Sequence, residues 1–263
     1  MAIRSQWRAW LCLAAILGVI MFCACHNKAR AESALSSIQI ALAPFDAPVE
    51  LPPPLAAPFN LARPAISEAS ADAMAAKWKN LQSVIGLETR VIALCRQMPE
   101  ACPASTAHFL SIVDTARNET GRTRAGLINR AVNLAIRFSR DTTQFGAADI
   151  WQSPLMTFAS GSGDCEDYAI AKYVALREAG MSADDLKLVI VRNDSNGEDH
   201  AVTAARIDGE WLILDNRKML LLTDAQASDL RPLIALGEDT PKPLLVRDAG
   251  LDARFVAVPA TFG

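Results

Sequence analysis

The 263-residue sequence predicts an α+β protein in which helices come first and an antiparallel sheet follows. Apolar residues recur at helical spacing in three segments between residues 67 and 140. Three strand-like segments follow, and Asp208-Gly209 joins the last two with a strong signal for a two-residue hairpin. The sequence contains no internal repeat and no phosphate-binding glycine-rich loop. This order argues against a doubly wound nucleotide-binding fold.

The first 31 residues are typical of an export signal. Arg4 and Arg8 supply its positive end, a continuous apolar stretch runs from Leu11 to Cys25, and Ala29-Arg30-Ala31 offers a small-x-small cleavage site. Two alternatives stay open: an uncleaved anchor, for which the apolar run is short, and lipidation at Cys25, whose preceding residues match a lipoprotein signal poorly. We expect cleavage, and a mature protein in the periplasm.

Removal of the signal changes the charge and the cysteine count. The mature chain of about 230 residues suffices for one large domain. Loss of four basic residues lowers the formal net charge from −3 to −7, which leaves no electrostatic footprint for nucleic acid. The cysteines and histidines that remain are Cys95, Cys102, Cys165, His108 and His200.

Cys95 and Cys102 are separated by a short, turn-like segment that contains Pro99. In an oxidising compartment we expect them to form a disulfide; two reduced core thiols are the alternative. Their pairing leaves Cys165 as the unpaired thiol of an exported protein, which is then either a chemically active residue or a buried, inert one.

Residues 32–66 predict an extended arm, because they are rich in Pro and Ala and lack helical periodicity. The globular domain is expected over residues 67–263. Its helices are predicted at Ser67–Arg96, His108–Ala116, Ala125–Arg140 and Cys165–Ala179, the last buried and ended by Gly180. Its strands are predicted at Leu186–Arg192, His200–Ile207 and Glu210–Asp215.

Cys165 falls in the first turn of the buried helix, within the run Gly163-Asp164-Cys165-Glu166-Asp167. The positive end of the helix macrodipole there favours a thiolate over a thiol. A nucleophilic cysteine also needs a nearby base and a group that orients the base.

The predicted hairpin supplies both groups. A turn at Asp208-Gly209 places Val202 opposite Asp215, and His200 shares the face of Val202 two residues away. His200 and Asp215 are then diagonal neighbours with backbones roughly 7–8 Å apart, whereas a one-residue slip would separate them. A lone cysteine is more often a small core residue than a nucleophile. The helix start, the odd thiol and the His–Asp pair together favour a Cys-His-Asp triad.

These residues resemble the bacterial transglutaminase-like cysteine proteinases over roughly residues 70–235. The matching segments are Gly163–Ile170, Lys172-Tyr173, Leu176, Gly180, His200–Val202, Leu214–Asn216, and Asp149–Trp151 with Pro154. The resemblance implies a papain/transglutaminase-like fold, with Cys165 as nucleophile, His200 as general base and Asp215 as the orienting acid.

The best-known members of that family are LapG-type periplasmic proteases, which clip large surface adhesins and release biofilm cells. The resemblance therefore implies a large surface adhesin as the protein substrate, cut near its N-terminus. It also implies an inner-membrane cyclic-di-GMP receptor as inhibitor. Two other functions fit the residues: an amidase or acyl transferase acting on cell-wall peptides, and an inactive binding module of the same fold.

Asp164, Glu166 and Asp167 flank the nucleophile. Acids in a first turn stabilise a helix, and Asp164 suits the N-cap. Three carboxylates beside a sulfur nevertheless disfavour its thiolate, a penalty that a bound cation would remove. Carboxylates suit Ca²⁺, although the spacing is not an EF-hand loop. The LapG-type proteases depend on calcium through acids flanking the cysteine, so the resemblance implies Ca²⁺ bound by these three residues.

Overall fold

The computed structural model describes residues 56–147 and 149–238. The expected signal peptide, the arm up to residue 55 and the tail from residue 239 lie outside the described residues. Within the described ranges, no helix is both long enough and apolar enough to cross a membrane.

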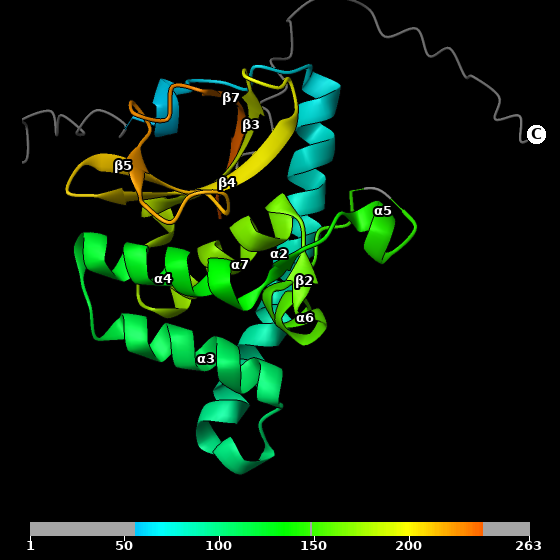
Figure 1. The fold of residues 1–263 in the computed structure, drawn as a ribbon, viewed down its shortest axis with the longest axis vertical. Coiled ribbons are helices and arrows are strands. Elements are labelled where there is room, and N and C mark those ends of the chain that lie inside the picture. Colours follow the sequence, from blue (N-terminus) through cyan, green and yellow to red (C-terminus); the bar gives the residue numbers. More distant parts are fainter. Residues whose placement is uncertain (1–55, 148, 239–263) are drawn as a thin grey trace, which may run out of the picture. The chain divides into compact units, whose positions relative to one another are not determined.

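Helices and strands follow the predicted α+β order (Figure 1). The α-helices are α2 (Glu68–Gln97), α3 (Ala104–Arg117), α4 (Gly121–Ala135), α5 (Asp141–Gln144), α6 (Pro154–Ser160) and α7 (Cys165–Glu178). The short 3-10 helices are η1 (Pro58–Asn60), η2 (Pro99–Ala101) and η3 (Ala183–Asp185). The strands are β1 (Arg137–Phe138), β2 (Ser162–Gly163), β3 (Leu186–Asn193), β4 (Asp199–Ile207), β5 (Glu210–Leu214), β6 (Leu222–Thr223) and β7 (Leu230–Leu236).

The main sheet is antiparallel, with the strand order β6-β5-β4-β3-β7. The β4–β5 hairpin pairs Ile207 with Glu210 and Thr203 with Leu214, the register predicted from the Asp208-Gly209 turn. Asp208 and Gly209 both have positive φ, as a tight hairpin turn of this kind requires. The two outer strands were not predicted, because β6 has only two residues and Pro232 interrupts the pattern of β7 at a register shift.

Helix α7 is the centre of the fold. It contacts β3 and β4 on one side and α3, α4 and α6 on the other (Figure 1). Its buried residues therefore surround the helix, as its sequence predicted, and they join the main hydrophobic core. The hydroxyl of Thr203 on β4 donates to the Ala169 carbonyl at 2.6 Å, so that the helix and the strand are tied directly.

The other face of the sheet carries a second apolar cluster centred on Val189, Val202 and Trp211. Phe59 of η1 packs against it, and the Trp211 indole donates to the Ala56 carbonyl at 2.8 Å. Residues 56–60, which the sequence assigns to the extended arm, thus cover this face.

Several helix boundaries were predicted wrongly: α3 begins at Ala104 rather than His108, and α4 begins at Gly121 rather than Ala125. The helix expected to reach Arg140 ends at Ala135, and Ile136 is already extended, with φ −109° and ψ 136°. The next two residues form β1, which pairs in parallel with β2. Phe138, which continues the helical spacing, is more than half exposed. Pairing with a distant segment outweighs the local periodicity here, and the seven-residue helix α6 was too short to be predicted.

The disulfide between Cys95 and Cys102 is present, with Cα atoms 4.8 Å apart. It joins the last turn of α2 to the segment that precedes α3. Cys165 is the free cysteine of the described residues.

Candidate active site

Cys165 is the first residue of α7 and follows the short strand β2 after one intervening residue, Asp164. Asp164 is the N-cap, and its backbone N–H donates to Asp167 Oδ2 at 3.3 Å as part of a capping box. Gly163 is needed for this geometry, because a Cβ at that position would lie 2.5 Å from the same oxygen. The side chain of Asp167 thus folds back over β2 and determines where the helix begins.

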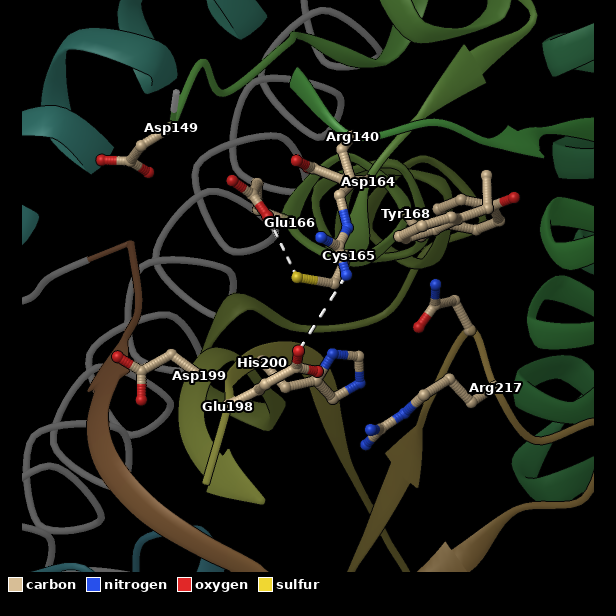
Figure 2. Close-up of a pocket in the computed structure, with 12 residues that line it drawn as sticks. Arg140, Asp149, Asp164, Cys165, Glu166, Tyr168, Glu198, Asp199, His200 and Arg217 are labelled. Atoms are coloured by element: carbon tan, nitrogen blue, oxygen red, sulfur yellow. Dashed lines mark hydrogen bonds and ion pairs between the residues drawn. The ribbon is translucent and has the colours of Figure 1, made fainter. Parts of the chain in front are cut away.

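The Cys165 thiol borders a cavity of about 670 Å³ that His200 and Arg217 also line (Figure 2). The thiol donates to Glu166 Oε2 at 3.0 Å, and the backbone N–H of Ala201 donates to the sulfur. Burial, followed by the charge and hydrogen bond of Glu166, raises the pKa of Cys165 above its usual range. Without a cation beside Glu166, these effects oppose the thiolate that the helix macrodipole favours.

His200 and Asp215 come from the paired strands β4 and β5 and their ends. His200 Nε2 lies 2.9 Å from Asp215 Oδ1, and both side chains are buried. The Arg217 backbone N–H donates to the same oxygen at 2.9 Å, and its guanidinium contacts both carboxylate oxygens at 3.3 Å. Burial alone would raise the pKa of Asp215, but the bond and charge of His200 and the donors of Arg217 hold it below its usual range.

This arrangement leaves one ring nitrogen of His200 for chemistry. Because Asp215 is ionised, Nε2 carries the hydrogen that it donates, and Nδ1 remains free to accept a proton. The structure therefore brings the three predicted triad residues to one site. The thiol, however, is hydrogen-bonded to Glu166 rather than to His200.

Two of the three predicted metal ligands lie in a carboxylate cluster. Oxygens of Asp141, Asp164 and Glu166 lie within 4.8 Å of one another. Asp141 Oδ1 and Asp164 Oδ1 are buried and have no hydrogen-bond partner among the described residues. Burial, with the hydrogen bond and charge of Asp164, raises the pKa of Glu166 to about 8. Crowded, undersatisfied carboxylate oxygens are the donor set that Ca²⁺ prefers, so these residues fit the ion.

Asp167 lies apart from that cluster. Its Oδ1 accepts the backbone N–H of Gln152 at 2.7 Å, and its Oδ2 accepts the Gln152 amide at 2.6 Å. The carboxylate is fully buried, and burial, opposed by these bonds, raises its pKa to about 7. Both oxygens of Asp167 thus accept hydrogen bonds that shape the start of the helix. The third carboxylate of the cluster is that of Asp141, whereas Asp167 was predicted.

Sequence reasoning missed Asp141 and Gln152. Asp141 reaches the cluster because β1 pairs with β2: the Ser139 N–H donates to the Gly163 carbonyl at 2.9 Å, next to Asp164. No local sequence pattern predicts a parallel pair of two-residue strands. Gln152 follows the Asp149–Trp151 motif directly, but no sequence pattern of its own marked it.

A thiol at the N-terminus of a buried helix, facing a sheet that supplies a buried His–Asp pair, defines a papain/transglutaminase-like cysteine peptidase. The chain belongs to the bacterial transglutaminase-like cysteine proteinases, since the sequence model of this family matches residues 88–228, more than half of the chain. No functionally curated protein matches it.

Among solved structures, the chain resembles calcium-bound LapG of Legionella pneumophila, with 21% identity and a TM-score of 0.50 over 56% of this chain and 84% of that one. An EGTA-treated LapG of the same organism gives 22% identity and a TM-score of 0.45, over 66% and 83% of the two chains. The first likeness supports a shared fold.

Proposed function

We propose that the protein is a periplasmic, calcium-dependent endopeptidase that uses Cys165, His200 and Asp215 as its triad. The observation that carries this proposal is the 2.9 Å contact between His200 Nε2 and Asp215 Oδ1, beside the cavity that the Cys165 thiol faces. This contact holds the imidazole in the tautomer that a base requires.

In the proposed reaction, His200 Nδ1 accepts the thiol proton of Cys165, and the sulfur attacks a peptide carbonyl carbon. The tetrahedral intermediate collapses when the imidazolium of His200 protonates the departing amine, which leaves a thioester on Cys165. Water, deprotonated by His200, then attacks the thioester, and the sulfur leaves as a thiolate. The product acid is released, and the imidazolium returns its proton to Cys165. Asp215 remains ionised throughout and stabilises the imidazolium.

Calcium is proposed to be held by Asp141, Asp164 and Glu166, where it supplies positive charge beside the nucleophile. The undersatisfied oxygens of Asp141 and Asp164 support this ligand set. Glu166 has a second role in the proposal, because its carboxylate accepts the thiol hydrogen at 3.0 Å. A cation held there would compete with the thiol hydrogen for the Glu166 carboxylate and would favour the thiolate of Cys165.

The proposed substrate is a large surface adhesin, cut near its N-terminus to control biofilm attachment. The proposed inhibitor is an inner-membrane cyclic-di-GMP receptor. Membership of the family supports both through the resemblance of the motif residues. The predicted export signal in residues 1–31 and the disulfide between Cys95 and Cys102 support a periplasmic location.

The test uses the purified N-terminal region of such an adhesin and the mature protein, with Ca²⁺ or with EGTA. We expect one defined cut with Ca²⁺, little with EGTA, and none with Cys165→Ala. Mass spectrometry of the products separates hydrolysis from transfer to an added amine, which would identify an acyl transferase instead. Cleavage that persists in Cys165→Ala would refute the proposed nucleophile. If the wild type does not cleave the adhesin, and a variant with Ala at all three triad positions still binds it, the protein is a binding module.

A further inference from the structure

Lys172 is a fully buried lysine on α7, two turns beyond Cys165. Its Nζ lies 3.5 Å from the Leu214 carbonyl oxygen and 5.9 Å from the centre of the Tyr168 ring. Among the described residues, no carboxylate oxygen lies within 4.0 Å of it. Burial lowers the pKa of Lys172 to about 7, and the charge of Asp215 acts against that shift.

A buried ammonium without a close ion-pair partner opposes folding, because the free energy of its desolvation exceeds the free energy gained from its remaining contacts. An apolar side chain of similar length would pack in the same space without that cost. Lys172 is therefore poorly explained as a core residue alone. Strongly perturbed groups of this kind concentrate at functional sites.

The one carbonyl that Lys172 contacts belongs to the last residue of β5, and the next residue is Asp215. Lys172 thus links the helix that carries Cys165 to the strand end that carries the acid. Arg217 contacts the Asp215 carboxylate from the side of the cavity, which its own side chain lines (Figure 2). The segment is thus contacted by Lys172 at the Leu214 carbonyl and by Arg217 at the Asp215 carboxylate.

We propose that Lys172 is a positioning residue, which holds the Leu214–Asp215 segment so that Asp215 Oδ1 accepts the hydrogen of His200 Nε2. This proposal rests on the proposed role of Asp215 in the triad. Lys172 itself is fully buried and is not among the residues that line the cavity beside Cys165. It acts through Asp215, in concert with Arg217.

The test compares Lys172→Met, which removes the charge but keeps the length, with the exposed control Lys79→Met on α2. Three quantities are measured: kcat on the adhesin fragment, the urea midpoint of unfolding, and the low-field proton resonance of the His200 Nε2–H. We expect Lys172→Met to lower kcat about tenfold with little change in KM, to weaken or shift the resonance, and to leave the urea midpoint equal or higher. Lys79→Met should change none of these.

A second series separates this inference from the proposed function. In an Asp215→Asn background, Lys172→Met should lower kcat no further, because the two residues act as one unit. If Asp215→Asn abolishes activity while Lys172→Met leaves kcat and the resonance intact, the positioning role is refuted and the triad stands. If Asp215→Asn has no effect, the triad itself fails.

Loss of kcat that only accompanies a lower urea midpoint would show a structural role and also refute the inference. Should Lys172→Met not fold, Lys172→Gln replaces it, since its polar end is too short to reach the Leu214 carbonyl. Retention of kcat and of the resonance in that folded variant would overturn the proposal.

Discussion

His200 and Asp215 lie 15 positions apart in the chain, yet their side chains meet at 2.9 Å between Nε2 and Oδ1. The β4–β5 hairpin brings them together, since its register pairs Thr203 with Leu214 and continues outward to these two residues. The bond is buried, so water does not compete for the carboxylate. The register of the hairpin therefore brings the base and the acid together.

Replacement of Asp215 tests the role of the acid in orienting His200. In Asp215→Asn, the amide no longer selects the productive imidazole tautomer, and we expect kcat to fall by about 100-fold or more. The measurement is steady-state cleavage of the adhesin fragment. Arg192→Ala, which removes an exposed ion pair with Asp199 on the same sheet, is the matched control and should retain activity. Equal activity in Asp215→Asn and the control would contradict the role of the acid.

Gly163 and Gly86 form a second matched pair. In Gly163→Ala, the new Cβ would lie 2.5 Å from Asp167 Oδ2, so the capping box must shift, and we expect a loss of about 1–3 kcal/mol together with reduced activity. Gly86→Ala adds a Cβ in open space on α2 and should stabilise the protein by up to about 1 kcal/mol. Urea denaturation checks both, and a neutral Gly163→Ala would show that the close approach at α7 is unimportant.

The choice of calcium ligands is tested by two acids that border the site. Asp141→Asn should weaken Ca²⁺ binding at least about tenfold, because it removes a buried ligand charge. Asp149→Asn should leave affinity unchanged, since Asp149 is exposed and paired with Lys77 at 2.6 Å. Isothermal titration calorimetry measures the Ca²⁺ affinity of both variants and of the wild type. Normal affinity in Asp141→Asn would exclude this carboxylate as a ligand.

The same carboxylates predict how stability depends on pH when calcium is chelated. In the folded state, burial raises the pKa of Glu166 to about 8 and that of Asp167 to about 7, well above unfolded values. Their contribution is thus fully present below about pH 4 and is lost as the pH rises through 7 to 8.

In EGTA we therefore expect the melting temperature to rise as the pH is lowered from 8.5 to about 5.5. Added Ca²⁺ should raise it most at the upper end, where the carboxylates are ionised. Asp215 acts with the opposite sign: its pKa is lowered, so its contribution is lost only under strong acid, outside this range. A melting temperature in EGTA that stays constant or rises with pH would contradict raised pKa values of Glu166 and Asp167 in the folded state.

Local sequence determined much of this protein. The Asp208-Gly209 turn and the alternating strands around it determine the β4–β5 register, and with it the His200–Asp215 pair. The periodicity of α7 and the stop at Gly180 determine a buried helix with Cys165 in its first turn. These features depend on neighbours within a few residues or across one tight turn, where turn chemistry and hydrophobic period suffice to predict geometry.

Only the tertiary structure decided the rest of the site. The helix predicted to reach Arg140 stops early because β1 pairs with β2, and that pairing carries Asp141 to the acids beside Cys165. Gln152 donates to both oxygens of Asp167, which lies apart from the cluster. The burial of Lys172 beside the Leu214 carbonyl likewise depends on how α7 packs against the end of β5. Each is a contact between different segments of the chain, so its free energy arises only once the core has assembled.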